Sequence, residues 1–495
     1  MGTYLLDFDW TVMAPELVIV ITAALLTILD LILKEKYSYP VTKFLSIWAV
    51  GLAGYFVITG WGDSSYQILA DTYRVDPFSL LFKGIFLLGT LFILLFSFAK
   101  KRINEYYYLL LTALLGAMMM VSAADLITLY VGLELLSISS YILVGIQKRK
   151  KQANEAAWKY MILGGASSAF ILYGMSFLYG LSGSTNLYVI QQAVQEGLTS
   201  GYGAFVYLSF ALIIIGFGFK ISTAPFHTWA PDVYQGAQAP ITAFLASISK
   251  AAGFALMLRV LILAFSPLFT TGDWERLVSP LLLTLAALSM IVGNTVALKQ
   301  TNAKRLMAYS SIAQAGYLLV PLATMGMLLF PSMVFYLIVY IMMVIAAFVI
   351  VEQVTDATGD DDIRAFAGLY QRSPLLSLVM TVLLISLAGL PITAGFVGKV
   401  LLISNAIYTQ HFVITFIMIA TTVVSYYYYF GIIRQIYFRS PANQNPIPIR
   451  WEQGLILGMS IAMVLGLGLF PGYLIQFLGE VDWGSAFQMA TNSGR

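Results

Sequence analysis

The chain has 495 residues, of which 59% are hydrophobic and only 10% are charged, whereas a soluble protein of this length would carry about a quarter charged residues; the composition is that of a polytopic membrane protein. The formal net charge of +3 offers no broad basic face for nucleic acid. The sequence has no cysteine and only two histidines, which excludes disulfides, thiolate zinc sites and cysteine-ligated iron–sulfur clusters, and we expect no metal or cofactor to bind in this chain.

Fourteen apolar segments are long enough to span a bilayer, because a spanning helix needs about 20 predominantly apolar residues. The seventh segment is interrupted and continues to residue 236, and the twelfth is also interrupted. The pattern predicts an all-α polytopic membrane protein that forms a single membrane domain over residues 1–495. In chain order the segments cover residues 12–33, 41–60, 78–98, 106–124, 126–146, 157–181, 204–222, 240–265, 277–298, 304–325, 331–352, 374–409, 412–436 and 454–478.

The basic residues of the loops predict the orientation of these segments. Loops that follow odd-numbered spans carry eighteen Lys and Arg, whereas loops that follow even-numbered spans, together with the two tails, carry three. Cytoplasmic loops carry the excess of Lys and Arg in membrane proteins. We therefore expect the odd-numbered loops to face the cytoplasm and both termini to lie outside.

Two spans contain helix-breaking residues near their middle. The seventh reads GFGFKISTAPFHTWAPD, with Pro225 and Pro231, and the twelfth reads LAGLPITAGFVGKVLL, with Gly389, Pro391 and Gly395. Proline removes a backbone donor and clashes with the preceding turn, so the freed carbonyls need partners from protein or water. Broken helices at matching places in two halves are typical of inverted-repeat transporters, whose binding site lies at the break.

The two broken spans lie five spans apart, and this odd offset reverses the direction of the helix, as an inverted repeat requires. We predict a first inverted repeat of spans 4–8 over residues 105–265, a second of spans 9–13 over residues 277–438, and a last transmembrane helix over residues 454–478. Lys220 precedes the first break in sequence and Lys399 follows the second.

Four ionisable side chains lie deep inside apolar stretches: Glu134, Lys220, Lys250 and Lys399. A charge near the bilayer centre costs roughly 2.5–3.5 kcal/mol on insertion scales, so such groups usually mark ion or proton pathways. A free lysine has a pKa of about 10.4, which desolvation lowers and a neighbouring carboxylate raises again. A Glu–Lys pair in an apolar interior is therefore a switchable element, and we predict that these four residues form a proton path.

The segment GLELLSISSYILVG places Ser137 on the same helical face as Glu134. If Glu134 neighbours Lys220, the distance between them would control when Lys220 gives up its proton. Lys250 would then relay the proton toward the midline, and Lys399 would hold or release it in the second half. Water must join these groups, because single side chains do not span the distances.

Other ionisable residues allow two interpretations. His227 lies at the first break and either bridges the line of lysines or is a hydrogen-bonded packing residue, since histidine changes charge near neutral pH. Lys83 and Lys159 lie within two turns of a span end, and Arg259 about one and a half turns from one. We expect these three long side chains to snorkel toward the membrane surface.

Four segments resemble the antiporter-like membrane subunits of complex I. They are GLELLSISSYILVG, GFGFKISTAPFHTWAPDVYQGAQAPITAFLASISKAAG, ALKQTNAKRLMAYSSIAQAGYLLV and SLAGLPITAGFVGKVLL, and the similarity runs from about residue 75 to 435. The resemblance implies a fourteen-helix fold with inverted repeats, in which Glu134 and Lys220 are the input pair, Lys250 the central relay and Lys399 the terminal lysine. It also implies a basic residue at Lys159, near the start of span six.

The resemblance further implies a proton-translocating subunit of respiratory complex I without a redox centre of its own. NADH, FMN, iron–sulfur clusters and quinone are then expected in partner subunits. The partners would be the lipid bilayer and other membrane subunits of complex I, including a neighbouring antiporter-like subunit. The location would be a bacterial plasma membrane or an equivalent energy-coupling membrane.

Three other functions remain open from the residues. A subunit of a multi-subunit cation/proton antiporter, or of a ferredoxin- or hydrogenase-linked relative of complex I, would share these motifs. A passive scaffold would not need four buried ionisable groups. A transporter of a small anionic solute would be expected to carry a mid-span arginine at its site, and none is apparent.

Overall fold

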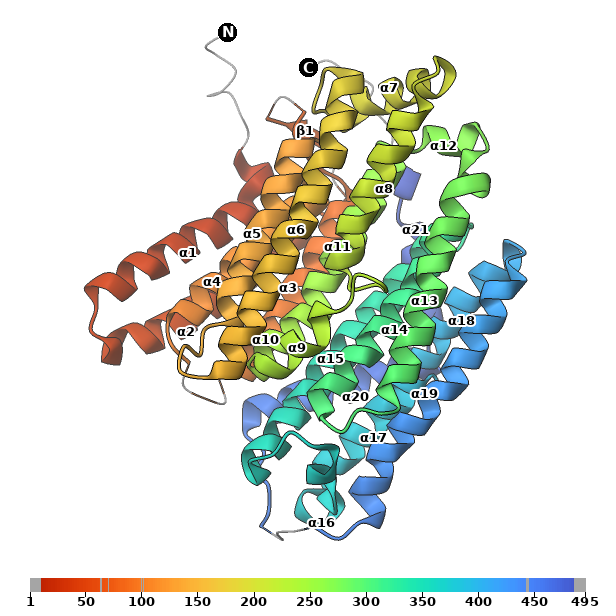
Figure 1. Ribbon diagram of the computed structural model, residues 1–495. Coiled ribbons are helices and arrows are strands. Elements are labelled where there is room, and N and C mark those ends of the chain that lie inside the picture. Colours follow the sequence, from red (N-terminus) through yellow and green to blue (C-terminus); the bar gives the residue numbers. More distant parts are fainter. Residues whose placement is uncertain are drawn as a thin grey trace.

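The computed structural model describes residues 10–62, 65–69, 71–98, 100, 102–441 and 445–484, and of residues 35–37 only the backbone. Within these residues, thirteen helical segments are long and apolar enough to cross a membrane. This confirms the predicted all-α polytopic architecture (Figure 1). In chain order the thirteen are η1 (Trp10–Met13) with α1 (Ala14–Ile32), α2 (Glu35–Thr59), α3 (Pro77–Ser97), α4 (Glu105–Ser122), α5 (Leu126–Val144), α6 (Lys151–Ser182), α8 (Gly203–Lys220), α10 (Ala239–Phe244) with η2 (Leu245–Ser249) and α11 (Lys250–Leu263), η3 (Trp274–Val278) with α13 (Ser279–Ala297), α14 (Ala303–Thr324), α15 (Leu329–Thr358), α19 (Phe412–Phe438) and α20 (Trp451–Leu469).

The remaining span is the broken twelfth, which consists of the shorter helices α17 (Pro374–Ala388) and α18 (Ala394–Tyr408). The seventh span is broken as well, because α8 is followed by α9 (Trp229–Gly236) after eight non-helical residues. Both predicted breaks are present. Short elements connect the spans: a hairpin of β1 (Tyr66–Ile68) and β2 (Tyr73–Val75), α7 (Leu187–Thr199), α12 (Pro267–Thr270), η4 (Ile363–Phe366) and α16 (Leu369–Arg372). A further short helix, α21 (Gly472–Glu480), follows the last span.

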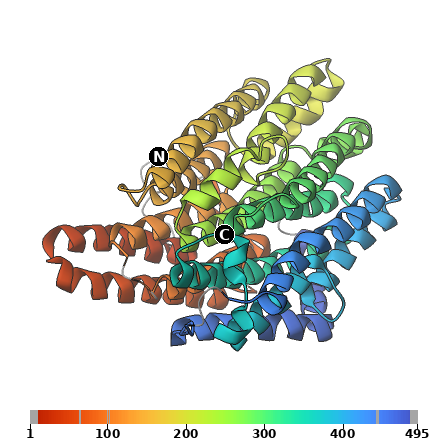
Figure 2. The ribbon, with the colours of Figure 1, turned by 60° about the horizontal axis from the view of Figure 1, so that its bottom comes forward.

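The helices lie in rows, with the first half of the chain beside the second (Figures 1 and 2). The paired helices α1 and α2, drawn in red, project from one edge. The centre is formed by α10–η2–α11, α14 and α15, whose residues are almost all buried. Only about a third of the residues of α1, α2, α19 and α20 are buried, as expected where a helix faces lipid or another subunit.

The first two helices of each predicted repeat pack in the same way. Gly116 of α4 lies against the α5 backbone: a methyl group there would lie 2.6 Å from the Gly132 carbonyl oxygen. Gly293 of α13 lies against α14 in the same manner, 2.8 Å from the Tyr309 carbonyl oxygen. Small residues allow such close helix contact in membranes. These two contacts correspond, and the repeats over residues 105–265 and 277–438 stay a prediction.

The structure departs from the predicted spans at two places. The last long helix ends at Leu469 instead of continuing to residue 478, because Phe470 leaves the helical conformation and Pro471 has no N–H to continue the ladder. The predicted continuous span 240–265 contains a π-helical turn, η2, directly before Lys250. Such turns inside α-helices often occur at functional sites.

The prediction that Lys83 and Arg259 snorkel is wrong. Both residues are 0% exposed. Lys83 pairs with Glu16 of α1 at 2.9 Å, and Arg259 pairs with Asp76 at 2.7 Å. The number of residues between each side chain and its span end did not predict the burial of Lys83 and Arg259. The N-terminal helices and the hairpin region before α3 fold over both residues and supply their carboxylate partners.

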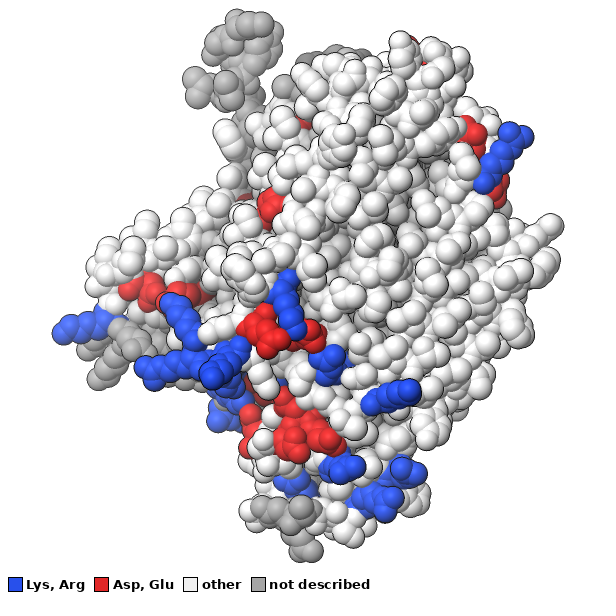
Figure 3. All heavy atoms as spheres, viewed as in Figure 1, with Lys and Arg blue, Asp and Glu red and all other residues white. Residues whose placement is uncertain are grey.

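Charged side chains gather toward the lower end of the molecule, and a broad uncharged surface covers most of the rest of the face in Figure 3. The connections from α5 to α6 and from α13 to α14 lie at this end (Figure 1), which we call the basic face. Lys148, Lys150 and Lys304 of these connections line one pocket together with Lys100. A charged end beside a broad uncharged surface on this face matches a protein embedded in a bilayer.

Asp76 anchors the opposite end of the bundle and its loss should destabilise the fold. It caps α3 and pairs with both Arg74, at 3.3 Å, and Arg259. Asp76→Ala leaves two buried guanidinium groups without their carboxylate, which typically costs about 3–5 kcal/mol. We expect a sharply lower yield of folded chain and a lower unfolding temperature in detergent.

The matched control is Asp356→Ala, which removes an ion pair with Lys100. In this pair the Lys100 side chain is 38% exposed and the Asp356 side chain is 44% exposed. Such pairs contribute about 0–1 kcal/mol. Equal unfolding temperatures for the two variants would contradict the anchoring role of Asp76.

Candidate functional site

Lys220 is the last residue of α8, directly before the first break. Its Nζ donates to Ser137 Oγ at 2.9 Å. Glu134 lies one turn earlier on the same helix, α5, and its carboxylate accepts from Ser168 of α6. Lys220 therefore contacts α5 one turn from Glu134, which puts the two residues near each other, as predicted. Within the described residues, Glu134 forms no direct ion pair with Lys220.

The first break is stabilised by hydrogen bonds from other parts of the protein. Trp229 of α9 donates its indole N–H to the Phe219 carbonyl at 3.0 Å. The backbone N–H of Ala224 donates to Ser289 Oγ of α13 at 2.9 Å. Irregular backbone is tolerated at membrane depth only when protein or a cavity satisfies it. The partner on α13 ties the break in the first half to the second half.

Lys250 is the first residue after the π-helical turn η2 and is 2% exposed. Its Nζ donates to the backbone carbonyl of Ser311 at 2.6 Å and to Ser311 Oγ at 2.5 Å. Tyr340 of α15 donates to the same hydroxyl at 2.9 Å, and the Tyr234 hydroxyl lies 3.4 Å from it. Ser311 therefore connects the central lysine to three other helices: α9, α14 and α15.

Lys399 reaches back across the second break. Its Nζ donates to the carbonyls of Leu387 at 2.9 Å and Ala388 at 3.1 Å, the last two residues of α17. It also lies 5.0 Å from the centre of the Tyr317 ring, a cation–π contact. The C-terminal carbonyls of a helix lack partners within the helix and attract cations. Lys399 thus occupies the carbonyls that the break sets free.

The positions of the two lysines in sequence now have an explanation. Lys220 lies before its break and Lys399 after its own, but the Lys399 side chain folds back to the end of the preceding half-helix. Both ammonium-bearing residues are therefore associated with the C-terminal end of the first half-helix, α8 or α17. The two lysines therefore differ in whether their backbone lies before or after the break, and not in which half-helix end their ammonium group is associated with.

Helix α14 links the central lysine to the second break. Ser311 binds Lys250, and Gln314, one turn later, donates to the Leu387 carbonyl at 3.4 Å and accepts from the Tyr336 hydroxyl. Tyr317, another turn later, lies under Lys399. Residues at this spacing share a helix face. A line of polar side chains thus runs from Lys250 to Lys399 through an apolar core.

Sequence reasoning missed the members of this line on α14 and α15: Ser311, Gln314, Tyr317, Tyr336 and Tyr340. A signal was present in the segment SSIAQAGY, whose polar residues recur every third position. That spacing could have been interpreted as one polar face of a buried helix. Uncharged residues carry no large insertion cost, and for that reason they did not stand out as the lysines did.

The two remaining candidates lie away from this line of contacts. His227 is half-buried in the first break with its ring 6.5 Å from that of Tyr309, and its Nδ1 has no hydrogen-bond partner in the part of the chain that the structure describes. Lys159 is not buried; it pairs with Glu155 and with Asp232, each at 2.7 Å. Asp232 also pairs with Arg305 of α14 at 2.5 Å. These pairs hold α6, α9 and α14 together near the basic face.

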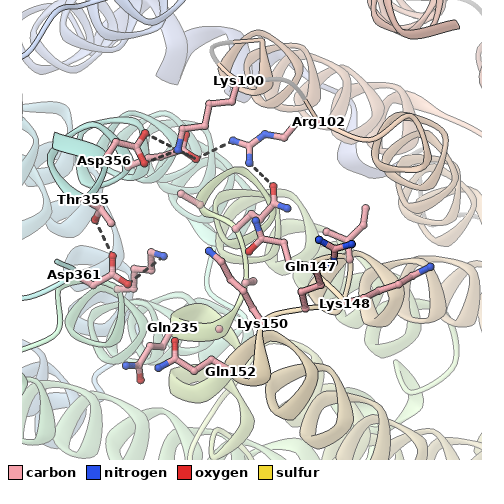
Figure 4. Close-up of a pocket in the computed structure, with 18 of the residues that line it drawn as sticks. Lys100, Arg102, Gln147, Lys148, Lys150, Gln152, Gln235, Thr355, Asp356 and Asp361 are labelled. Atoms are coloured by element: carbon pink, nitrogen blue, oxygen red, sulfur yellow. Dashed lines mark hydrogen bonds and ion pairs between the residues drawn. The ribbon is translucent and has the colours of Figure 1, made fainter. Parts of the chain in front are cut away.

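A pocket of about 780 Å³ opens on the basic face between the two halves (Figure 4). Lys100 lies next to Asp356, Arg102 donates to Gln238 and pairs with Glu352, and Lys304 pairs with Asp361. The pocket wall includes Ala239, the first residue of α10, and this helix continues through η2 to Lys250. Most charges on the wall are thus neutralised by neighbours. The pocket brings solvent to the end of this helix but does not reach the lysine itself.

Comparison with known proteins gives a consistent family. Residues 123–425 match the family described as "NADH:quinone oxidoreductase/Mrp antiporter, TM". A relative from Brevibacillus brevis, named "NADH-quinone oxidoreductase subunit N", is 45% identical, with 95% of this chain and 95% of the relative covered. A relative of the same name from Anoxybacillus flavithermus is 44% identical, with 98% and 99% covered.

A solved structure shares the fold over most of the chain. It is a chain of "Respiratory complex I from Thermus thermophilus with bound Aureothin", at 33% identity and a TM-score of 0.79. The match covers 94% of this chain and 99% of that chain. The similarity thus extends from the sequence of the matched segment to the fold of most of the chain.

The second break should depend on Gly395. A methyl group at this position would lie 2.0 Å from the Ser386 carbonyl oxygen of α17. Gly395→Ala must therefore push the half-helices apart, and overpacking of this kind typically costs about 1–3 kcal/mol. We expect a lower unfolding temperature in detergent.

Gly431→Ala on α19 is the control, because nothing lies within 4 Å of the added methyl group. It should be neutral or slightly stabilising, since alanine favours helix over glycine. If both variants unfold at the wild-type temperature, the close contact at the second break is not needed.

Proposed function

The chain belongs to the NADH:quinone oxidoreductase/Mrp antiporter family of membrane subunits, and from this premise we propose that Glu134, Lys220, Lys250 and Lys399 carry protons across the membrane. Like its relatives of the name subunit N, the chain is a proton-translocating membrane subunit of NADH-quinone oxidoreductase, or complex I. The alternative subunits, of a cation/proton antiporter or of a ferredoxin- or hydrogenase-linked relative, are not favoured, because the identity of 44–45% covers nearly the full length of relatives with this one name.

One observation supports the path most strongly: the three lysines are bound by neutral oxygens. Lys220 donates to a serine hydroxyl, Lys250 to Ser311, and Lys399 to two backbone carbonyls. Among the described residues, none of the three has a carboxylate within ion-pair distance. A lysine in a tight ion pair keeps its proton, whereas a desolvated lysine on neutral acceptors can exchange it. These side chains are therefore suited to carry protons.

The path begins at the Glu134–Lys220 pair in this proposal. Glu134 lies one turn from Ser137, to which Lys220 donates, so a small shift of Glu134 toward or away from Lys220 changes the stability of the charged lysine. The proton then passes through water to Lys250. Ser311 and Gln314 extend the route along α14 to Lys399.

His227 and Lys159 have supporting roles in this proposal. The free Nδ1 of His227 at the first break offers a hydrogen-bonding site for water between Lys220 and Lys250. Lys159 holds Asp232 of α9, and through it the second half of the broken helix, close to α14. A proton taken up at the basic face would meet this cluster of charges before the buried lysines.

The surroundings follow from the same family. The chain is a multi-pass membrane protein, and its partners are other subunits of the complex. We propose a bacterial plasma membrane or an equivalent energy-coupling membrane, with the basic face toward the cytoplasm. Both termini would then lie outside; residues 1–9 and 485–495 are not among the described residues. A neighbouring antiporter-like subunit would be one partner, and NADH, FMN, iron–sulfur clusters and quinone would act in other subunits.

Lys220→Ala and Glu134→Ala should each lower proton pumping while the complex still assembles. A positioned proton-transfer group accelerates transfer by about 10²–10⁴-fold, so the share of pumping that passes through this chain should be lost. The measurement is proton uptake by inverted membrane vesicles per NADH oxidised. Ser176→Ala on the exposed side of α6 is the control. Unchanged pumping in an assembled Lys220 variant would refute the path.

The partner assignment has its own test. After mild solubilisation, a native gel stained for NADH dehydrogenase activity should show this chain in a large active band. A large band without that activity would indicate the antiporter or a differently fuelled complex. Migration of the chain alone would contradict the assignment to a complex.

A further inference from the structure

A groove follows the outer side of α19, apart from the line of lysines. It has a volume of about 550 Å³ and lies between α19, the end of α13 and the start of α14. Helix α19 lies at one edge of the molecule (Figures 1 and 2), where a membrane protein meets lipid or another subunit. None of the four residues of the proposed proton path lines this groove. Its occupant therefore has to match the chemistry of its own walls.

The walls of the groove change from apolar to polar along α19. One end carries Val423 and Tyr427, whose side chains are 57% and 75% exposed. The other end carries Arg434 and Gln435, together with Gln300 of the connection between α13 and α14. This connection lies at the basic face (Figure 1), so the polar end of the groove is at the membrane surface. The apolar end lies deeper in the bilayer.

The length of this gradient matches one leaflet of a bilayer. Val423 and Arg434 are eleven residues apart, which is about 16 Å along a helix axis. The hydrocarbon core of a bilayer is about 30 Å thick, so each leaflet contributes about 15 Å. An acyl chain that reaches Val423 therefore places the headgroup of the same lipid molecule beside Arg434.

Arg434 is the charged residue of the groove wall. Its side chain is exposed and forms no ion pair or hydrogen bond within the described residues, and none of the described residues that line the groove is acidic. The pocket between the two halves differs, because Lys100, Arg102 and Lys304 there each pair with a carboxylate. A guanidinium binds two phosphate oxygens at once. The charge of the groove is thus complementary to an anionic headgroup.

A transmembrane helix of another subunit would fit these walls less well. Helix interfaces in membranes are rich in small residues, which let two backbones approach each other. The α19 wall instead presents the bulky rings of Tyr426, Tyr427 and Phe430. Such rings keep a second helix at a distance, whereas a flexible acyl chain can follow the hollows between them.

We propose that this groove binds one anionic phospholipid of the leaflet at the basic face. An acyl chain lies along α19 from Arg434 toward Val423, and the Arg434 guanidinium holds the phosphate. The bound lipid packs against Tyr428, whose hydroxyl donates to Asn294 of α13 at 3.0 Å. The lipid thus covers the line along which α19 joins α13. This binding site does not depend on the proposed proton path.

Photolabelling of the assembled complex tests the site. The complex is reconstituted into phosphatidylcholine vesicles that contain a small share of phosphatidylglycerol with a diazirine in one acyl chain. After illumination, mass spectrometry of the digested chain locates the attached lipid. We expect label on residues 423–435 of α19. If this segment carries no label, because another subunit covers the groove or because the lipid binds elsewhere, the proposal is overturned.

Arg434→Gln tests the contact with the headgroup. Because Arg434 is exposed and has no partner within the described residues, the variant should fold and assemble. Loss of one hydrogen bond to a charged group weakens binding about tenfold or more. Label on residues 423–435 should therefore fall by about this factor when the probe does not saturate the site. Wild-type labelling of the variant would refute the proposed headgroup contact.

Arg439→Gln is the matched control. Arg439 directly follows α19 at the same end, is exposed and does not line the groove. This variant should label as the wild type does. An equal fall in both arginine variants would mean that the general charge of the basic face attracts the lipid, and the groove would then not be a site. The same photoprobe with a phosphatidylcholine headgroup should give less label, and equal labelling would contradict the preference for an anionic lipid.

Discussion

The structure depends on the need of a lysine ammonium in an apolar interior for oxygen atoms to bind. A regular membrane helix cannot supply them, because its carbonyls are already bonded within the helix. The break between α17 and α18 removes this limit, and Lys399 takes the freed carbonyls of Leu387 and Ala388. The same requirement explains the glycine at 395, since α18 must lie close enough to α17 for its lysine to reach back. The broken helix is therefore what allows the lysine to be buried, because it supplies the oxygen atoms that the ammonium binds.

The buried charges of this chain fall into two kinds, which differ in their partners. Asp76 and Arg259 form a charged pair with further bonds to backbone and side chains. Separating these charges would leave each in a medium of low dielectric, so the pair stays fixed. Lys220, Lys250 and Lys399 bind only neutral oxygens within the described residues, and a neutral amine, which retains two N–H donors, could keep the same contacts. Only the second kind allows the charge to change without breaking the fold.

The sequence was sufficient to predict the helices, the two breaks and the charged members of the site, because each of these has a large energetic signature. A charge in an apolar run costs several kcal/mol, and a proline interrupts a helix wherever it occurs. Lys83 and Arg259 show the limit: their distance from a span end suggested a surface position, but partners from α1 and the loop before α3 bury them. Ser311 and Gln314 show another limit, since neutral polar residues on a buried helix are distinguished only by what they contact.

The two halves differ at one equivalent position, and this difference indicates where the proposed proton path is controlled. Gly116 touches α5 at Gly132, and Gly293 touches α14 at Tyr309, so these two positions correspond. Glu134 and Ser311 each follow two residues later. The first half therefore has a carboxylate where the second half has a hydroxyl. A carboxylate exerts a charge that a small movement can strengthen or weaken at the lysine beside it, whereas a serine only orients a hydrogen bond. The first half can respond to an electrostatic change from a neighbour, and the second half, with neutral partners only, is suited to pass on the proton that it receives.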